Sequence, residues 1–380
     1  MVYIPTELVL EILVRLPWTS LRRLRLVCRT WRDLVHDRTT EMKQCRDAVP
    51  LIVTTESVYV LDDQGSSNSK AVTPRELWPG RTTACNIYKN MEVVGACNGV
   101  LCLCDDARPG GAITLLNPVT ADILALPPIP CAGVFRRHNT RRPGRSWHQA
   151  YSFGYHHATG QYKVVHVPCF FKTKETLHVF TLGEASWREV PVPDARCRLD
   201  AGLVSVSGAT YWVTEGSKEK IMAFDHRSEQ VRSTKPLPMS ARRPICQLTQ
   251  VHRRLSAATS DQIHGRGSIE VWVLESTGME QTWVHQQSLR YLPSPWPSVK
   301  LAHPNYIYRE YELMFGDPKG QGQKLFGWRL KPTNYVTRSE CSVWNYYSFD
   351  KPLVSDIRGD VCRTLEYIKT TESLSVYRRW

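Results

Sequence analysis

Cysteine is the first residue type to consider for chemistry, because a thiolate can bind a metal and the chain has 12 cysteines among 380 residues. Cys97, Cys102 and Cys104 lie close together and could supply thiolate ligands to a metal ion. A structural zinc site takes four Cys or His ligands in closely spaced pairs, and no second pair accompanies these three. Cys102 and Cys104 alternate along an expected strand, so both point to one face, as core residues do. We therefore expect buried, reduced thiols, and neither a metal nor a cofactor.

Histidine could provide acid–base catalysis, but its placement does not favour an active site. His156 and His157 are neighbours, and neighbouring residues on a strand point to opposite faces. His264 lies in a Gly-Arg-Gly turn. The sequence contains neither a phosphate-binding glycine loop nor a Gly-x-Ser-x-Gly elbow. These observations favour a binding protein over an enzyme, and we assign no catalytic residue.

A basic segment is the third candidate for chemistry. Residues 131–150 contain no acidic residue and five arginines, Arg136, Arg137, Arg141, Arg142 and Arg145, in a chain whose formal net charge is +13. A basic stretch with aromatic residues can contact RNA or an acidic protein, or it can be a solvated insertion. Among the binding alternatives we favour an acidic patch on a protein over nucleic acid.

The elements that would position such groups begin with a helix near the N-terminus. Pro5 and Thr6 fit a helix start, with Pro in the first turn and Thr as the cap. Pro17 ends the helix, because a proline inside a helix loses a hydrogen bond and clashes with the preceding turn. Four apolar residues share one face of this helix: Leu8, Ile12, Leu13 and Leu16.

A second amphipathic helix is expected after Ser20, which offers an N-cap. Its apolar residues recur every three or four positions: Leu21, Leu24, Val27, Cys28, Trp31, Leu34 and Val35. Two short helices cannot cover this much apolar surface by themselves. The pair is either a cap that packs on the following domain or a docking module completed by another protein.

The N-terminal residues resemble the F-box motif almost position for position, from Ile4-Pro5-Thr6-Glu7-Leu8 through Arg15-Leu16-Pro17 to Trp31-Arg32. The resemblance implies a small domain of three helices that binds the Skp-type adaptor of a cullin-based ubiquitin ligase. It assigns adaptor contact, partly shared with packing inside the domain, to Pro5, Leu8, Ile12, Leu13, Leu16, Pro17, Leu21, Val27, Cys28 and Trp31. The motif usually ends in an aromatic residue, and Met42 is the nearest candidate here.

The remainder of the chain is rich in expected strands. Short apolar runs are bounded by Gly, Pro, Asn and Asp, as in all-β domains. A loose repeat has its anchors at Leu116, Phe180, Phe224 and Val273, which are separated by 64, 44 and 49 residues. This spacing predicts a β-propeller of about six or seven four-stranded blades, and a large β-sandwich is the alternative.

A second resemblance covers roughly residues 90–290. The pieces Val94-Gly-Ala-Cys-Asn-Gly-Val-Leu-Cys-Leu103, Asn117-Pro118, Phe153-Gly-Tyr155, Tyr211-Trp212 and Phe224-Asp225 resemble the F-box-associated interaction domain of plant F-box proteins. This resemblance implies a kelch-like or propeller-like receptor surface for a protein substrate. We predict an all-α F-box domain over residues 1–48 and a β-rich recognition domain over residues 49–380.

Together these features predict a non-catalytic, substrate-recognising subunit of a Skp–cullin–F-box ubiquitin ligase. The Skp-type adaptor and, through it, a cullin are the expected partners, with a protein substrate that the sequence does not name. The alternative is a propeller that binds a small ligand, carbohydrate or RNA, or a scaffold whose F-box acts outside a ligase. No basic stretch precedes an apolar run at the N-terminus, and no apolar stretch reaches ~18 residues, so we expect a cytoplasmic or nuclear protein without a membrane partner.

Overall fold

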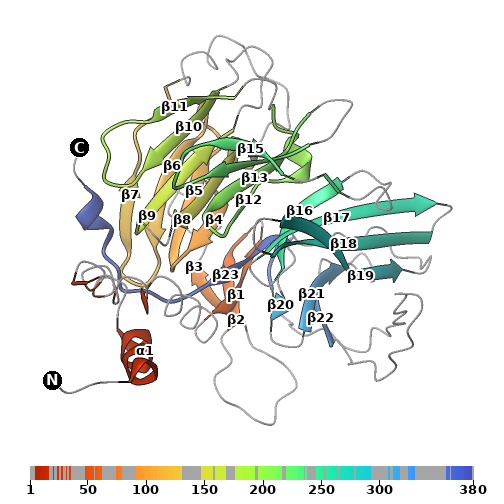
Figure 1. The fold of residues 1–380 in the computed structure, drawn as a ribbon, viewed down its shortest axis with the longest axis horizontal. Coiled ribbons are helices and arrows are strands. Elements are labelled where there is room, and N and C mark those ends of the chain that lie inside the picture. Colours follow the sequence, from red (N-terminus) through yellow and green to blue (C-terminus); the bar gives the residue numbers. More distant parts are fainter. Residues whose placement is uncertain are drawn as a thin grey trace.

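The computed structural model describes residues 5–16, 20, 24, 27–28, 31, 34–35, 48–54, 56–61, 74–78, 91–130, 147–156, 159–167, 176–192, 196–215, 220–234, 236–237, 245–251, 254–263, 266–277, 280–291, 307–308, 311–316, 324–329, 357–359 and 361–378. Its fold is mostly β (Figure 1). No helix within these ranges is long and apolar enough to cross a membrane.

Helix α1 spans Thr6–Arg15 and is the N-terminal helix that the sequence predicts. Pro5, not Thr6, takes the N-cap position, and its carbonyl accepts hydrogen bonds from the amides of Leu8 and Val9, each at 3.1 Å. The capping role predicted for Thr6 is therefore wrong. The helix ends because Leu16 adopts an extended conformation (ψ 146°), as residues before a proline do.

Beyond α1, the N-terminal module is described only at separate residues. Ser20, Leu24, Trp31 and Leu34 are helical, so Ser20 lies within a helix and not at its cap. The predicted total of three helices is not confirmed by these residues. Pro17, Leu21 and Met42 lie outside the described ranges.

The β-domain consists of successive antiparallel sheets. Blade 1 joins β23 (Val361–Tyr367) to β1 (Val49–Thr54), β2 (Val58–Leu61) and β3 (Pro74–Trp78). Blade 2 contains β4 (Met91–Cys97), β5 (Val100–Asp105), β6 (Ala112–Asn117) and β7 (Asp122–Ala125). Blade 3 contains β8 (Tyr151–His156), β9 (Gln161–His166), β10 (Thr176–Thr181) and β11 (Arg188–Pro191).

Three further sheets follow. Blade 4 contains β12 (Val204–Val206), β13 (Ala209–Val213), β14 (Ile221–Asp225) and β15 (Val231–Ser233). Blade 5 contains β16 (Ile245–Val251), β17 (Arg254–Ile263), β18 (Arg266–Thr277) and β19 (Glu280–Tyr291). The last sheet has three strands, β20 (Ile307–Tyr308), β21 (Tyr311–Gly316) and β22 (Lys324–Arg329).

This arrangement is a β-propeller, as predicted. Consecutive blades touch through their first strands: β23 contacts β4, β4 contacts β8, β8 contacts β12, and β12 contacts β16. Within the described ranges there are five four-stranded blades and one three-stranded sheet, fewer complete blades than the predicted six or seven. The four repeat anchors lie on β6, β10, β14 and β18, each the third strand of its blade, so the predicted repeat is confirmed.

Blade 1 joins the two ends of the propeller. β23 pairs with β1 from Val49 opposite Tyr367 to Thr54 opposite Val361. The Arg363 guanidinium of β23 also donates hydrogen bonds to the carbonyls of Val93 and Val94 on β4, where a bulge interrupts the β4–β5 ladder. The C-terminal strand therefore holds the N-terminal strands of blade 1 and, through β4, the edge of blade 2.

The strand order defines two faces of the propeller. On the linker face, β1 begins and β23 ends, and the turns Asn98–Gly99, Thr159–Gly160 and Ser207–Gly208 connect first strands to second strands. On the far face, first strands begin, and the β5–β6 turn (Asp105–Gly111) lies there. Because the N-terminal module precedes Val49, its linker reaches the propeller at the linker face.

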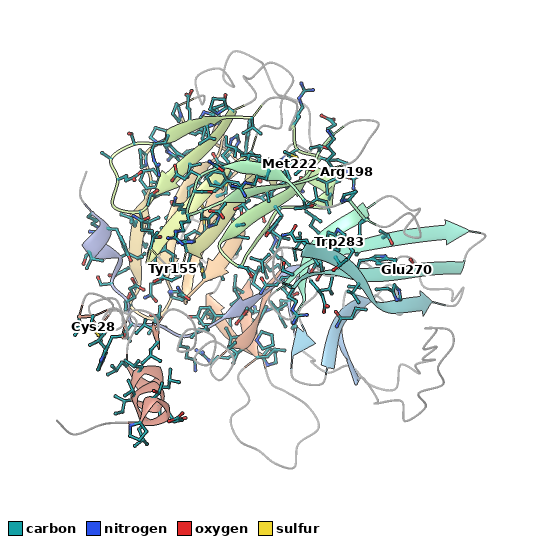
Figure 2. All side chains as sticks on the ribbon, viewed as in Figure 1. Cys28, Tyr155, Arg198, Met222, Glu270 and Trp283 are labelled. Carbon is teal, nitrogen blue, oxygen red and sulfur yellow. The ribbon has the colours of Figure 1, made fainter. Side chains whose placement is uncertain are left out.

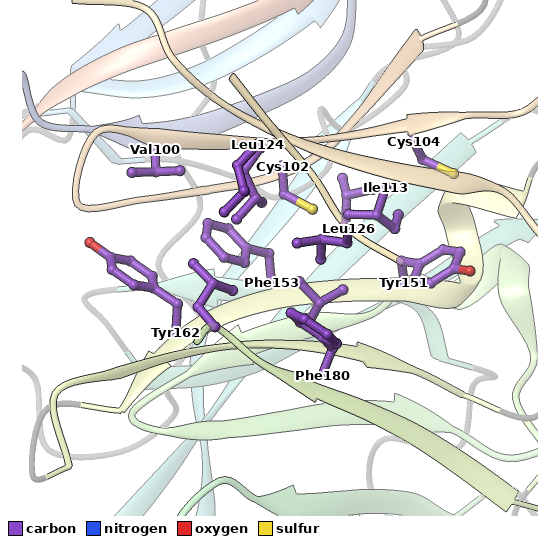
Figure 3. Packing of buried hydrophobic residues seen from close by; sticks show 14 of the residues in the cluster. Val100, Cys102, Cys104, Ile113, Leu124, Leu126, Tyr151, Phe153, Tyr162 and Phe180 are labelled. Atoms are coloured by element: carbon purple, nitrogen blue, oxygen red, sulfur yellow. The ribbon is translucent and has the colours of Figure 1, made fainter. Parts of the chain in front are cut away.

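Apolar cores lie between consecutive blades. Between blades 2 and 3, Cys102 and Cys104 of β5 pack with Phe153 of β8 and Phe180 of β10 (Figure 3). Similar clusters lie between blades 1 and 2, between blades 3 and 4, and between blades 4 and 5. Each of these blades therefore buries apolar side chains against its neighbours, which is why strands such as Val100–Asp105 read as continuous apolar runs.

The segment after β23 closes over blades 2 and 3 at the linker face. The amide nitrogen of buried Asn117 donates to the carbonyls of Thr370 (3.1 Å) and Glu372 (2.7 Å). The buried Glu372 carboxylate accepts hydrogen bonds from the hydroxyls of Tyr377 (2.7 Å) and Tyr162 (3.1 Å). A side chain at Gly99 would lie 2.3 Å from the Ile368 carbonyl, so glycine is required where this tail crosses the turn.

Replacing Asn117 with alanine should lower the free energy of unfolding by about 2–3 kcal/mol, because two buried carbonyls of the tail lose their donor. Val119→Ala, in the same turn but 47% exposed, should change it by less than ~0.5 kcal/mol. Urea unfolding of both variants measures the difference. Equal stability of the two variants would show that the tail does not depend on Asn117.

Candidate functional site

Helix α1 carries apolar side chains around roughly 200° of its circumference at 100° per residue. Leu10 and Leu13 are buried, at 5% and 0% exposure. On the adjoining part of the arc, Leu8 and Ile12 are 56% and 54% exposed. One turn separates these two residues, so they form a stripe on the helix surface. The described part of the N-terminal module buries only part of the apolar arc.

The buried part of the arc holds the N-terminal module together. Leu13 and Val35 form its core, and Leu16, Leu24 and Trp31 pack against them. By contrast, Val27 is 64% exposed and Cys28 is exposed (Figure 2). Replacing a large buried side chain with a smaller one lowers stability, so the buried residues have a structural role. The exposed apolar side chains are available for contact with a partner.

The structure thus divides the residues predicted to contact an adaptor. Leu8, Ile12, Val27 and Cys28 are exposed, and we use the term docking stripe for this set of four residues. Leu13, Leu16 and Trp31 pack in the core of the module, as the shared role expected from the sequence requires. Pro5 is exposed at the helix start. Adaptor contact itself stays a prediction for all of these residues.

On the far face, a hydrogen-bonded pair fixes the chain between blades 2 and 3. The Asp106 carboxylate accepts bonds from the His148 amide (2.9 Å) and from the His148 ring Nδ1 (2.6 Å). The Tyr151 hydroxyl donates to the Gly110 carbonyl at 2.5 Å. These contacts hold the 3-10 turn η3 (Trp147–Ala150) against the β5–β6 turn. Asp106 and His148 are 42 residues apart, so no local sequence pattern could predict the pair.

A charged cluster links blades 3 and 4 near the linker face. The buried Lys163 ammonium donates to the Glu229 carboxylate and to the His226 carbonyl, both at 2.5 Å. Arg188 donates to the other oxygen of Glu229 at 2.5 Å. Burial would raise the pKa of Glu229, but the hydrogen bonds from Lys163 and Arg188 outweigh it and lower that pKa. The groups satisfy one another, which indicates an inter-blade clasp and not a ligand site.

Three buried histidines are held neutral. Tyr151, His166, His178 and Glu189 are successive cross-strand partners in blade 3, and the ring centroids of Tyr151 and His166 lie 4.7 Å apart. Burial lowers the pKa of His166 from 6.5 to about 3, and that of His226 in blade 4 to about 3 as well. Burial also lowers the pKa of His178. The imidazoles of His166 and His226 are therefore neutral near pH 7.

The cysteines and histidines singled out as candidates for chemistry have structural roles where the structure describes them. Burial raises the pKa of the Cys102 and Cys104 thiols, and both lie on one side of β5, in the same core, as predicted. His156 is half-buried, and its ring Nδ1 is hydrogen-bonded to the hydroxyl and the backbone amide of Thr159 in the following turn. His157, His264 and residues 131–146 of the basic segment lie outside the described ranges. No group of three or more His, Cys, Asp or Glu suited to a metal occurs among the described residues.

Comparisons with known families match residues 61–308 to the F-box associated beta propeller domain and residues 1–41 to the F-box-like family. Among similar proteins of Arabidopsis thaliana, the F-box protein At3g07870 is 24% identical over 350 residues, which cover 81% of this chain and 78% of that protein. The F-box/kelch-repeat protein At2g43445 is 23% identical over 305 residues, 80% of this chain and 68% of that protein.

Solved structures are similar only at a low level. The dihydro-heme d1 dehydrogenase NirN aligns with a TM-score of 0.33 at 12% identity, covering 62% of this chain and 44% of NirN. The acylaminoacyl peptidase of Pyrococcus horikoshii aligns with a TM-score of 0.32 at 11% identity, covering 63% of this chain and 38% of the peptidase. Similarity at this level carries no argument about function.

The buried histidines predict loss of stability in acid. His166 takes up a proton below pH 6.5 in the unfolded chain, but only below about pH 3 in the folded protein. The free energy of unfolding therefore falls as the pH falls from 6.5 to about 3. At pH 5.5 the loss should be about 1 kcal/mol for His166, and about the same for His226. In His166→Phe, the free energy of unfolding should fall less between pH 7.5 and pH 5.5, because the contribution of His166 is absent. Urea unfolding at the two pH values measures the difference. An unchanged pH dependence in the variant would contradict this account.

Proposed function

The chain belongs to the family of proteins with an F-box associated beta propeller domain, and on that premise we propose that it is the substrate-recognition subunit of a Skp–cullin–F-box ubiquitin ligase. In this role the N-terminal module docks on a Skp-type adaptor, which links it to a cullin. The propeller holds a target protein. The chain itself performs no bond chemistry, and it accelerates ubiquitin transfer by raising the effective concentration of target lysines near the conjugating enzyme.

The exposed docking stripe is the observation that carries this proposal. Leu8, Ile12 and Val27 are each more than half exposed, and they account for three of the seven large apolar residues exposed in the described ranges. Burial of apolar surface is favourable by ~25 cal/mol for every Å² removed from water, so a partner that covers these side chains gains that free energy. Leu8 and Ile12 lie on the same helix as Leu13, which packs with Val35 in the core of the module, so that helix is held in place by contacts other than those proposed for the partner.

The topology is compatible with an adaptor on the N-terminal module and a target on the propeller. The linker from the N-terminal module reaches the propeller at the linker face, because β1 begins there. In the proposed role, an adaptor bound to the module lies on the side of the linker face, and a target is held on the far face. β7 ends and β8 begins on the far face, and contact of the basic segment, residues 131–150, with an acidic patch on a target stays a prediction.

An aspartate in the docking stripe should weaken adaptor binding strongly without unfolding the module. Ile12→Asp should weaken binding of a purified Skp-type adaptor at least ~30-fold, because a charge is desolvated in the interface. Val119→Asp is the matched control, since it places the same charge at an apolar residue of similar exposure on the propeller. Calorimetric titration measures both affinities, and circular dichroism checks that both variants are folded.

Leu13→Asp would not serve the same purpose, because Leu13 is fully buried and the variant would lose folding together with binding. Two outcomes would overturn the proposal. The wild-type chain could show no adaptor binding at micromolar concentrations, or Ile12→Asp could bind as tightly as Val119→Asp.

A further inference from the structure

The β5–β6 turn on the far face exposes its positive charge and engages its negative charges. The Arg108 side chain is 73% exposed, whereas those of Asp105 and Asp106 are 20% and 21% exposed. The Asp105 carboxylate accepts a hydrogen bond from the Ala107 amide (3.0 Å) and lies 3.3 Å from Arg108 Nε. The amide and the ring of His148 bind the Asp106 carboxylate. The turn therefore presents a guanidinium to solvent, while both carboxylates have partners within the protein.

Arg108 retains hydrogen-bond donors for a partner. A guanidinium carries five N–H donors in a planar fork, and the ion pair with Asp105 is made through Nε. An exposed ion pair of this kind contributes little to stability, so a carboxylate of another protein can compete for the same guanidinium. The fork of an arginine matches a carboxylate with two parallel hydrogen bonds. A carboxylate is therefore the group that this side chain is best suited to bind.

The backbone of the turn is held in place before a partner binds. The Arg108 amide donates to the Asp105 carbonyl (3.3 Å), and the Gly111 amide donates to the Arg108 carbonyl (2.8 Å). The Tyr151 hydroxyl donates to the Gly110 carbonyl at 2.5 Å. Gly110 and Gly111 have φ values of 81° and 76°, which glycine adopts without strain. A partner thus meets a preformed turn, which lowers the entropic cost of binding.

Three of the sequences that join consecutive blades are basic, and their flanking strand ends lie on the same face as this turn. β3, β7 and β15 end on the far face, and β4, β8 and β16 begin there. The intervening residues 79–90, 126–150 and 234–244 contain ten Lys or Arg and no Asp or Glu. These ten residues lie outside the described ranges, so only their number and charge are known. The other far-face connections of blades 1 to 5 contain seven residues of each sign.

The connections on the linker face lack this excess of positive charge. In blades 1 to 5 they contain three Lys or Arg and four Asp or Glu. They are residues 62–73, 98–99, 118–121, 157–160, 182–187, 207–208, 226–230, 252–253 and 278–279. The charge of the strand connections is thus biased towards the far face. A local excess of one charge attracts a partner of the opposite charge and raises its association rate.

We propose that the far face binds an acidic segment of the target protein at the β5–β6 turn, with Arg108 as a contact residue. The inference rests on the proposed function and names the chemistry of the target. Asp and Glu side chains of the segment pair with the exposed guanidinium, and further carboxylates are attracted by the basic connections between blades. In the proposed role the occupant is a protein, so we favour an acidic polypeptide over a nucleic acid.

Binding of a fluorescein-labelled peptide of ten glutamates to the full-length protein tests the inference. Fluorescence anisotropy should show saturable binding. Arg108→Glu should weaken it at least about fivefold, because the peptide then meets a carboxylate in place of a guanidinium. Arg227→Glu is the matched control, since it makes the same change of charge at an exposed arginine in the β14–β15 turn of the linker face. It should change the affinity less than about twofold, because salt screens distant exposed charges.

Arg108→Gln repeats the test without adding a negative charge to the turn, in case Arg108→Glu fails to fold. Absence of saturable peptide binding, or equal weakening by Arg108→Glu and Arg227→Glu, would overturn the inference. Tighter binding of a single-stranded DNA of ten nucleotides, weakened by Arg108→Glu, would also overturn it, because the surface would then favour nucleic acid. Adaptor binding by the same preparation separates the two proposals, since intact adaptor binding without peptide binding refutes the acidic-segment contact alone.

Discussion

The pairing of β23 with β1 is the constraint on which the rest of the structure depends. Blades 1 to 5 bury apolar side chains against their neighbours, so a blade at the open end of the series would expose an apolar face. Joining the C-terminal strand to the first strands after the N-terminal module places both ends of the propeller in one sheet. The tail that follows adds hydrogen bonds from Asn117 and Tyr162 to the same arrangement.

This closure also fixes the face at which the N-terminal module joins the propeller. Because β1 begins where β23 ends, the N-terminal module must join the propeller at the linker face. In the proposed role, the far face is the side of the propeller that is left for a target. Inter-blade contacts such as the Lys163–Glu229 clasp hold neighbouring blades together. Such contacts suit the proposed role of a ligase receptor, because ubiquitin transfer depends on where the target is held.

The sequence predicts the local features of this fold well. The F-box-like pattern and the end of α1 before Pro17 depend on neighbouring residues, and both agree with the structure or the family matches. The repeat anchors fall on third strands because each blade repeats one pattern of burial. The cap assigned to Thr6 is wrong since Pro5 has the extended conformation of an N-cap (ψ 143°), and its carbonyl already accepts the first helical bonds.

Features that join distant residues could not be predicted in this way. Nothing near Asn117 in the sequence indicates that it binds carbonyls more than 250 residues away. The division of the apolar arc of α1 into buried Leu13 and exposed Ile12 depends on where Val35 packs, and periodicity treats the two residues alike. The length of β19 was visible as a run from Glu280 to Tyr291 without glycine or proline, but its place at the edge required the sheet order.

The central claim is that the N-terminal module, and not the propeller, receives the adaptor. Hydrogen exchange of the full-length protein, with and without a saturating Skp-type adaptor, tests it most directly. The account predicts slower exchange in α1 and around Val27 and Cys28, and unchanged exchange in the far-face turn Asp105–Gly111 and in β19. Protection confined to the propeller, or no protection anywhere, would contradict it.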